Sequence, residues 1–275
     1  MTQLTIEELS SRLEEGVRDV FSSDSYRQYL NAMSRFHHYS YSNTLLILAQ
    51  KPDASYVAGF KTWNDSFNRR IRKGEKAIRI LRPLLAKTDD TEEEQEKRNR
   101  LSGFTVCSVF DISQTEGDEI PLSLTRILDC HVEDFQTFIS ALILVSPVPV
   151  AFREHMHAYG CFYPLENRIE IRSNLPQAQT VKTMIHEIAH ATLHRHETDS
   201  GRTARSRREI EAESVAYIVS THYGIDTSSY SFGYIASWSK DKDLATLKTS
   251  LQAIQQAAAH LISLLDCVLF PAGQN

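Results

Sequence analysis

His186-Glu187-Ile188-Ala189-His190 sets two imidazoles and a carboxylate within one helical turn. With 3.6 residues per turn, the two histidines lie on one helix face, and Glu187 projects beside them. Apart from Glu187, no acidic residue, lysine or arginine interrupts the run from Thr183 to His194. Such a run is typical of a helix that buries one face, so the pattern predicts a buried helix that offers two imidazoles to one metal ion.

A second helical pattern extends from Glu209 to Val219. Its apolar stripe consists of Ile210, Ala212, Val215, Ala216 and Val219. A catalytic zinc ion takes three protein ligands and keeps one position open for water, so a third ligand is expected. Glu209 and Glu213 lie one turn apart on this pattern. One of them can bind the metal while the other hydrogen-bonds a ligand histidine.

The two helices resemble those of the zincin metallopeptidases, in which an HExxH helix precedes a helix with a glutamate ligand. Glu209 follows His190 by 19 residues and precedes an alanine by three, as the ligand does in the ImmA/IrrE-like peptidases. This resemblance implies that His186, His190 and Glu209 bind zinc. It also implies that Glu187 is the general base and that Glu213 orients a ligand histidine. Glu211 is the weaker candidate for the third ligand, because it projects about 200° around the helix from Glu209.

Such a site would perform metal-assisted hydrolysis of an amide, with Glu187 carrying a proton from water to the leaving nitrogen. Zincins hold their peptide as an added strand at a sheet edge. Residues 160–163 and 168–172 have the pattern of two strands joined by a turn and could supply that edge. The group that stabilises the oxyanion stays open among Tyr217, Tyr223 and Tyr234. A structural metal without catalysis is the alternative.

The chain has 275 residues, enough for two modest domains. We predict an α+β protein with a first domain over residues 1–120 and a zincin-like domain over residues 125–275. Gly, Asp, Pro and Ser gather near the boundary, between Gly117 and Leu124. A run of charged residues from 89 to 100 has no apolar periodicity and predicts a solvated loop.

Hydrophobic periodicity predicts helices over residues 5–21, 25–36 and 42–50, and an amphipathic helix over the tail, 244–269. Strands are expected over residues 77–82 and 104–110. A hairpin-like turn is expected at Lys73-Gly74-Glu75-Lys76.

Basic residues are concentrated in the first half of a chain whose net charge is −5. From residue 69 to residue 82 there are seven of them against the single acid Glu75. Aromatic residues lie nearby in sequence. Cations that contact phosphates and aromatic rings that stack on bases are the means by which proteins bind single-stranded nucleic acid. A basic solvated face with tyrosines in the core is the alternative.

Four motifs of this half resemble, in order, the N-terminal domain of the ArdC-type antirestriction family. They are Tyr41-Ser42-Asn43-Thr44-Leu45-Leu46, Val57-Ala58-Gly59-Phe60-Lys61-Thr62-Trp63, Arg72-Lys73-Gly74-Glu75-Lys76 and Val109-Phe110-Asp111-Ile112-Ser113-Gln114-Thr115. The resemblance implies a domain that binds single-stranded DNA ahead of a zincin-like peptidase domain, on a protein of a mobile genetic element. The residues expected to contact DNA are Tyr41, Asn43, Trp63, Arg69, Arg70, Arg72, Lys73, Lys76 and Arg79.

The four cysteines are widely spaced without a CxxC pair, which is typical of a reducing cytoplasm and not of a cysteine zinc site. Charged residues interrupt any apolar core of a secretion signal, and no apolar run is long enough for a membrane span. We therefore expect a cytoplasmic protein whose partners are single-stranded DNA and a protein substrate, either a repressor or a restriction component. Two alternatives are a regulatory ImmA/IrrE-like protease that cleaves a repressor and a non-catalytic DNA-protecting protein.

Overall fold

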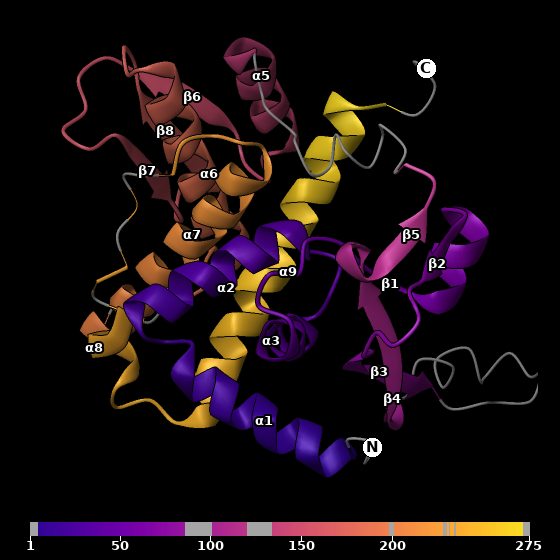
Figure 1. The fold of residues 1–275 in the computed structure, drawn as a ribbon. Helices are drawn as coiled ribbons and strands as arrows, with labels where there is room; N and C mark the ends of the chain where they lie inside the picture. The colour runs from indigo at the N-terminus through magenta and orange to yellow at the C-terminus, as the bar shows by residue number, and fades with distance from the viewer. Residues whose placement is uncertain are drawn as a thin grey trace, which may run out of the picture. The chain divides into compact units, whose positions relative to one another are not determined.

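The computed structural model describes residues 5–85, 101–119, 134–197, 201–227, 230, 232–233 and 235–271. The chain divides into two compact units, residues 1–19 with 42–121 and residues 20–41 with 122–275. Both contain helices and strands, which confirms the α+β class (Figure 1). Among the described residues, no helix combines the length and apolar character that a membrane crossing requires. The charged run at 89–100 lies outside the described residues.

The first unit is built around a small antiparallel sheet of order β1-β4-β3, with β2 and β5 forming a separate pair. Its elements are α1 (Ile6–Asp19), α3 (Tyr41–Gln50, whose first residue falls in the second unit), β1 (Val57–Gly59), the π-helix η1 (Thr62–Ser66), β2 (Arg69–Ile71), β3 (Ile78–Leu85), β4 (Leu101–Asp111), the 3-10 helix η4 (Ile112–Gln114) and β5 (Thr115–Gly117). Ile78, Ile80 and Val109 are buried on one face of the sheet, and their side chains belong to the core of this unit.

Strand β3 lies at the edge of that sheet, and two amides of α3 cover its exposed backbone. The Asn43 side chain donates to Leu81 O (2.8 Å) and accepts from Leu81 N (2.9 Å). Gln50, two turns later, does the same for Arg79, at 2.8 and 2.9 Å. Each amide therefore replaces a neighbouring strand, which satisfies groups that an open sheet edge leaves unpaired.

The predicted hairpin around Lys73–Lys76 is wrong, because the strands that flank it do not pair with each other. β2 pairs with β5, and β3 pairs with β4. The sequence pattern showed two extended segments correctly, but their partners lie at residues 101–117, which local periodicity cannot reveal.

The second unit contains a three-stranded sheet of order β6-β8-β7, in which β6 is parallel and β7 antiparallel to β8. Its elements are α2 (Ser23–Arg35), α5 (Phe135–Val145), β6 (Val150–Arg153), β7 (Gly160–Tyr163), β8 (Arg168–Arg172), α6 (Gln177–Leu193), α7 (Arg202–His222), α8 (Ile235–Ser239) and α9 (Leu244–Leu269). β7 and β8 have the predicted bounds, and Asn167 adopts a left-handed φ of 52° in the turn between them.

Helix α6 contacts the sheet through β7 and β8 and contacts α7, α5 and α9 on its other sides (Figure 1). This placement explains the uncharged run in the sequence, since Met184, Ile185 and Ile188 are fully or almost fully buried. Helix α2 packs against α7 within the same unit. The sequence-based division into 1–120 and 125–275 assigned α2 to the first domain, whereas its contacts are with the second unit.

Candidate metal centre and nucleic-acid surface

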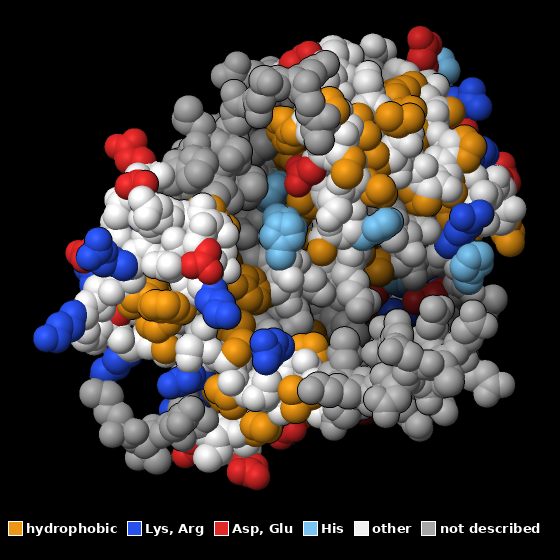
Figure 2. Space-filling model, turned by 90° about the vertical axis from the view of Figure 1, so that its right-hand side faces the viewer, with side chains coloured by type: hydrophobic (Ala, Val, Ile, Leu, Met, Phe, Trp, Pro, Cys, Tyr) orange, Lys and Arg blue, Asp and Glu red, His pale blue; other side chains and the backbone are white. Residues whose placement is uncertain are grey.

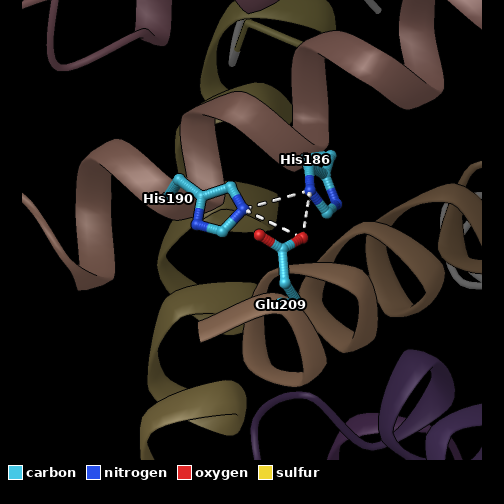
Figure 3. A group of neighbouring side chains, drawn as sticks. All are labelled: His186, His190 and Glu209. Atoms are coloured by element: carbon cyan, nitrogen blue, oxygen red, sulfur yellow. Dashed lines mark hydrogen bonds and ion pairs between the residues drawn. The ribbon is translucent and has the colours of Figure 1, made fainter. Parts of the chain in front are cut away.

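His186 and His190 face each other on α6. Their rings are 4.7 Å apart between centroids, and their Nε2 atoms are separated by 3.1 Å. Glu209, on the neighbouring helix α7, places Oε2 at 3.6 Å from His186 Nε2 and 3.7 Å from His190 Nε2. The three side chains converge on one point between the helices (Figure 3).

The spacing of these donor atoms fits one metal ion. A tetrahedral ion with bonds of about 2.05 Å separates its ligand atoms by about 3.4 Å. The three observed separations, 3.1, 3.6 and 3.7 Å, bracket that value. Among the residues that the structure describes, these three form the one group of His, Cys, Asp or Glu side chains whose ligand atoms lie close enough together to hold a metal ion. Two imidazoles with one carboxylate are a donor set typical of zinc and other divalent transition metals.

Glu213 lies one turn beyond Glu209 on α7, with Oε2 at 3.3 Å from His186 Nδ1. A carboxylate there stabilises the tautomer that carries its proton on Nδ1, which leaves the Nε2 lone pair for a metal. This contact is the one that the sequence prediction assigned to Glu213.

The carboxylates of Glu209 and Glu213 favour positive charge at the two histidine rings. Burial lowers the pKa of His186, but its pairing with Glu209 and Glu213 outweighs burial and raises that pKa to about 10. Pairing with His186 and His190 in turn holds the pKa of Glu209 far below its ordinary value. A proton is thus held where a metal ion would bind, and metal ions compete with protons for the same lone pairs.

Glu187 lines the same cavity as His186 and Glu213, a space of about 340 Å³. Burial raises the pKa of Glu187, although His186 and His190 act against it. Strand β7 passes so close that a Cβ on Gly160 would lie 2.9 Å from Glu187 Cγ and 2.6 Å from Thr183 Cγ2. The position of Glu187 is therefore defined by contact with the sheet.

Two other polar residues near the motif have different partners. Glu211 is buried and accepts from Ser250 Oγ (2.7 Å) and Arg207 Nη1 (3.1 Å). It lies away from the metal ligands, as its angular position on the helix predicted. His194 caps the end of α6, where its Nδ1 lies 3.2 Å from Glu197 Oε1. Both residues form part of a buried ionic network.

Two of the three tyrosines proposed for oxyanion stabilisation are engaged in other hydrogen bonds. The Tyr217 hydroxyl donates to Asn31 Oδ1 (2.8 Å), and the Tyr223 hydroxyl donates to Asp266 Oδ1 (2.7 Å). Tyr234 lies outside the described residues. Tyr230, which the sequence did not single out, lines the cavity together with Lys182. No local motif marks Tyr230, because it reaches the site through tertiary packing, whereas Lys182 lies one turn before His186 on the same helix.

In the first unit, the predicted DNA-binding cations fall into two groups. Three arginines are held by hydrogen bonds within the unit: Arg69 to Thr115 Oγ1 (2.8 Å), Arg72 to Glu75 Oε1 (2.8 Å) and Arg79 to Ser108 Oγ (2.6 Å). Arg70, Lys73 and Lys76 are exposed. Arg72 is exposed as well, although its guanidinium is paired with Glu75.

Trp63 is a core residue, so the expectation that its ring stacks on a base is corrected. Its side chain is fully buried, its Nε1 donates to Phe110 O (2.9 Å), and its ring packs against Phe67 at 5.4 Å. Asn43 is occupied by the edge of β3, as described above. Tyr41 is half-buried and falls in the second unit.

Exposed aromatic rings lie elsewhere in the first unit. Phe60 and Phe104 have exposed fractions of 59% and 45%. Phe104 and Ser108 are four residues apart on β4, so their side chains project from the same face of the sheet, the face that also carries Arg79. Hydrophobic side chains lie beside Lys and Arg side chains on the molecular face drawn in Figure 2. Tertiary packing determines which aromatic rings of this unit are exposed, and the sequence pattern does not show that packing.

Comparison with known proteins finds two family models. Residues 1–110 match the N-terminal domain of anti-restriction factor ArdC, and residues 149–263 match the IrrE N-terminal-like domain, a peptidase family. The second match contains all three predicted metal ligands.

Among curated proteins, the chain is 27% identical over 288 residues to the uncharacterized protein pXO2-81 of Bacillus anthracis. The match covers 89% of this chain and 48% of that protein, so the chain spans about half the length of this relative.

The Mn(II)-bound crystal structure of antirestriction protein ArdC from plasmid R388 is 17% identical, with a TM-score of 0.50. That alignment covers 84% of this chain and 85% of the ArdC chain. The likeness shows a shared fold. Together, the two family models identify an ArdC-type N-terminal domain followed by an IrrE-like domain in this chain.

Proposed function

We propose that this chain is a single-stranded-DNA-binding antirestriction-type protein of a mobile genetic element, and that its second unit is a zinc-dependent peptidase. The convergence of His186, His190 and Glu209 beside Glu187 carries the peptidase proposal. Zinc is the metal proposed because two imidazoles and one carboxylate leave an open position in a tetrahedral site. When bound, zinc would polarise the scissile carbonyl and lower the pKa of water.

The residues of the chain supply the remaining chemistry. Glu213 accepts a hydrogen bond from His186 Nδ1–H and so orients that ring. Glu187 takes the proton of the attacking water and donates it to the leaving nitrogen. Its burial beside the histidines supports this role, because a carboxylate with a raised pKa holds a proton more readily.

Strand β7 is the proposed docking edge for the peptide. Among the described strands it pairs with β8 alone, and its first residue, Gly160, contacts Glu187. A peptide added to this edge would gain main-chain hydrogen bonds and pass beside the general base.

Metal analysis and peptide cleavage test this proposal together. We expect about one zinc ion per chain in the wild type, a marked loss in Glu209→Ala, and a smaller loss in Glu213→Ala. Glu187→Gln should retain zinc and its fold but lose about 10²- to 10⁴-fold in cleavage of a quenched-fluorescent peptide library. Glu154→Ala, an exposed carboxylate of the same unit, is the matched control. Undiminished cleavage by Glu187→Gln would refute the general-base role.

The first unit is proposed to bind single-stranded DNA through Arg70, Lys73 and Lys76, with Phe104 as a stacking surface. In anisotropy titrations of a labelled oligo-dT, Lys73→Glu/Lys76→Glu should weaken binding and reduce the slope of log affinity against log salt by about 0.7 per lost contact. Lys240→Glu/Lys242→Glu makes the same charge change in the other unit. Phe104→Ala should weaken binding by about 1–3 kcal/mol. Affinity without salt dependence would exclude this surface.

An IrrE-like regulatory protease is the second proposed function, favoured by the match over residues 149–263. Its substrate would be a repressor or a restriction component. Cleavage of a co-resident repressor in the presence of single-stranded DNA, abolished in Glu187→Gln, would support it. DNA protection that survives Glu187→Gln would favour a non-catalytic role with a structural metal.

A further inference from the structure

The first two turns of α7 carry an excess of arginines. The stretch from Gly201 to Arg208 contains Arg202, Arg205, Arg207 and Arg208 and no acidic residue. The helix dipole favours acidic side chains at this end of a helix and disfavours cations, yet the first turn of α7 has no acid. The stability of the helix therefore does not explain these arginines.

Arg202 and Arg205 lie on the helix face that carries Glu209, the candidate metal ligand. At about 100° per residue, Arg202 is about 20° and Arg205 about 40° from Glu209 around the helix axis. At a rise of about 1.5 Å per residue, they lie about 10 Å and about 6 Å from it along that axis. Both arginines are exposed, and the Glu209 side chain has an exposed fraction of 50%, so this face is open to solvent. We call Arg202 and Arg205 the arginine pair.

The nearby acids are bound to a different arginine. Arg207 projects from the opposite side of α7, where it pairs with Glu197 at 2.5 Å and with Glu211 at 3.1 Å. Among the described residues, Arg202 and Arg205 form no ion pair. The arginine pair therefore presents two guanidinium groups without a described carboxylate beside them.

The metal ligands lie between the arginine pair and the cavity. Helices α6 and α7 are antiparallel, because Glu213 contacts His186 whereas Glu209, one turn earlier, also contacts His190. The arginine pair lies still earlier on α7, beyond His190, while the cavity is lined by residues 179–187 of α6. An extended peptide advances about 3.3 Å per residue, so a side chain two or three residues from the scissile bond would reach the arginine pair.

We propose that the arginine pair binds acidic side chains of a peptide substrate, two or three residues to one side of the bond that is cleaved. Guanidinium groups bind carboxylates through paired, charge-assisted hydrogen bonds. No aromatic residue lies between Gly201 and Glu209, so this face lacks the stacking surface that favours single-stranded DNA. The inference rests on the proposed peptidase function for the cleavage, but binding of an acidic peptide requires no hydrolysis and can be measured separately.

Calorimetric binding of blocked octapeptides to the zinc-loaded Glu187→Gln protein tests the arginine pair. The peptides share a neutral sequence and differ at two adjacent positions, which are Glu-Glu, Gln-Gln or Lys-Lys, placed either before or after a central Ala-Leu. In one of these two series, we expect Glu-Glu to bind about 10-fold more tightly than Gln-Gln at 50 mM salt, and Lys-Lys to bind no more tightly than Gln-Gln. Because both arginines are exposed, the preference should fall to about 2-fold at 0.5 M salt.

Variants of the arginine pair, compared at saturating zinc, identify the source of that preference. Arg202→Glu/Arg205→Glu should abolish it, and Arg202→Lys/Arg205→Lys should keep most of it. Lys240→Glu/Lys242→Glu makes the same change in net charge elsewhere in this unit and should leave the preference at about 10-fold. Zinc content and melting temperature should stay at the parent values. Equal binding of all peptides by the parent, absence of binding included, or a preference that survives the charge reversal, would overturn the proposal.

Oligo-dT binding distinguishes an acidic peptide from DNA as the ligand of the arginine pair. The charge reversal should leave the affinity for oligo-dT unchanged. A weaker affinity for oligo-dT, together with unchanged peptide binding, would assign these arginines to DNA and overturn the proposal.

Cleavage by the protein with Glu187 intact separates this proposal from the peptidase. A preference in binding that depends on the arginine pair, without any cleavage, would refute the peptidase and leave the acidic-peptide site standing. Cleavage with equal kcat/KM for the Glu-Glu and Gln-Gln peptides, unchanged by the charge reversal, would refute the acidic-peptide site and leave the peptidase standing.

Discussion

Gly160 shows how a single missing side chain positions Glu187, the proposed general base. An added Cβ would meet Thr183 Cγ2 at 2.6 Å and Glu187 Cγ at 2.9 Å, so one of these side chains would have to move. We predict that Gly160→Ala costs about 1–3 kcal/mol in stability and lowers peptide cleavage at least 10-fold, while zinc stays bound. Gly59→Ala is the control, because an added Cβ there meets no atom within 4 Å. Unchanged cleavage and melting temperature in Gly160→Ala would contradict this prediction.

His37 gives the stability of the second unit a dependence on pH. Its ring is buried against His38 at 3.8 Å and His222 at 4.8 Å. Burial first, and then these two neighbouring imidazoles, lower the pKa of His37 to about 3. The unfolded chain, with an ordinary histidine pKa of about 6.5, therefore binds a proton that the folded chain does not bind.

Stability should consequently fall as the pH drops from about 7 toward 3, by up to a few kcal/mol from this residue. Urea unfolding at pH 7.5 and pH 5.0 measures the effect. His37→Leu should reduce the difference between the two midpoints, and the exposed His196→Leu should not. An equal pH dependence in wild type and His37→Leu would rule out His37 as its source.

At the scale of elements, α3 and β3 depend on each other through side-chain amides. Removing either amide by Asn43→Ala or Gln50→Ala would leave an N–H and a C=O of the β3 edge without their partner. We expect a loss of about 1–3 kcal/mol for each. Hydrogen exchange should also accelerate at the amides of Leu81 and Arg79 respectively. Asn64→Ala, an exposed amide of the same unit, should leave both properties unchanged. Equal protection in Asn43→Ala and wild type would contradict this account of the edge.

At the scale of the molecule, α2 belongs to the unit that carries the candidate metal site. Tyr26, Tyr29, Leu30 and Met33 are fully buried there, and the Tyr26 hydroxyl lies 2.8 Å from Ser214 Oγ on α7. Burying four such side chains contributes about 8 kcal/mol, which is comparable to the whole stability of a domain.

A fragment of residues 125–275 should therefore fail to fold or bind zinc, although it contains every predicted ligand. A fragment of residues 20–275 retains α2 and should keep the metal. Near-ultraviolet circular dichroism and zinc content distinguish them. Cooperative melting of the 125–275 fragment with bound zinc would show that α2 is dispensable.

The local spacing of residues was sufficient to predict helix α6 with His186 and His190 on one face, because the two histidines are one helical turn apart in the chain. Periodicity likewise predicted α7, α9 and the pair β7 and β8. Other properties depend on which apolar faces bury each other. That packing brings Glu209 to within 3.7 Å of both histidines and Tyr230 beneath Lys182. It also buries Trp63, pairs β2 with β5, and assigns α2 to the second unit. Contacts between distant segments form only when the chain is compact, so a local pattern carries no record of them.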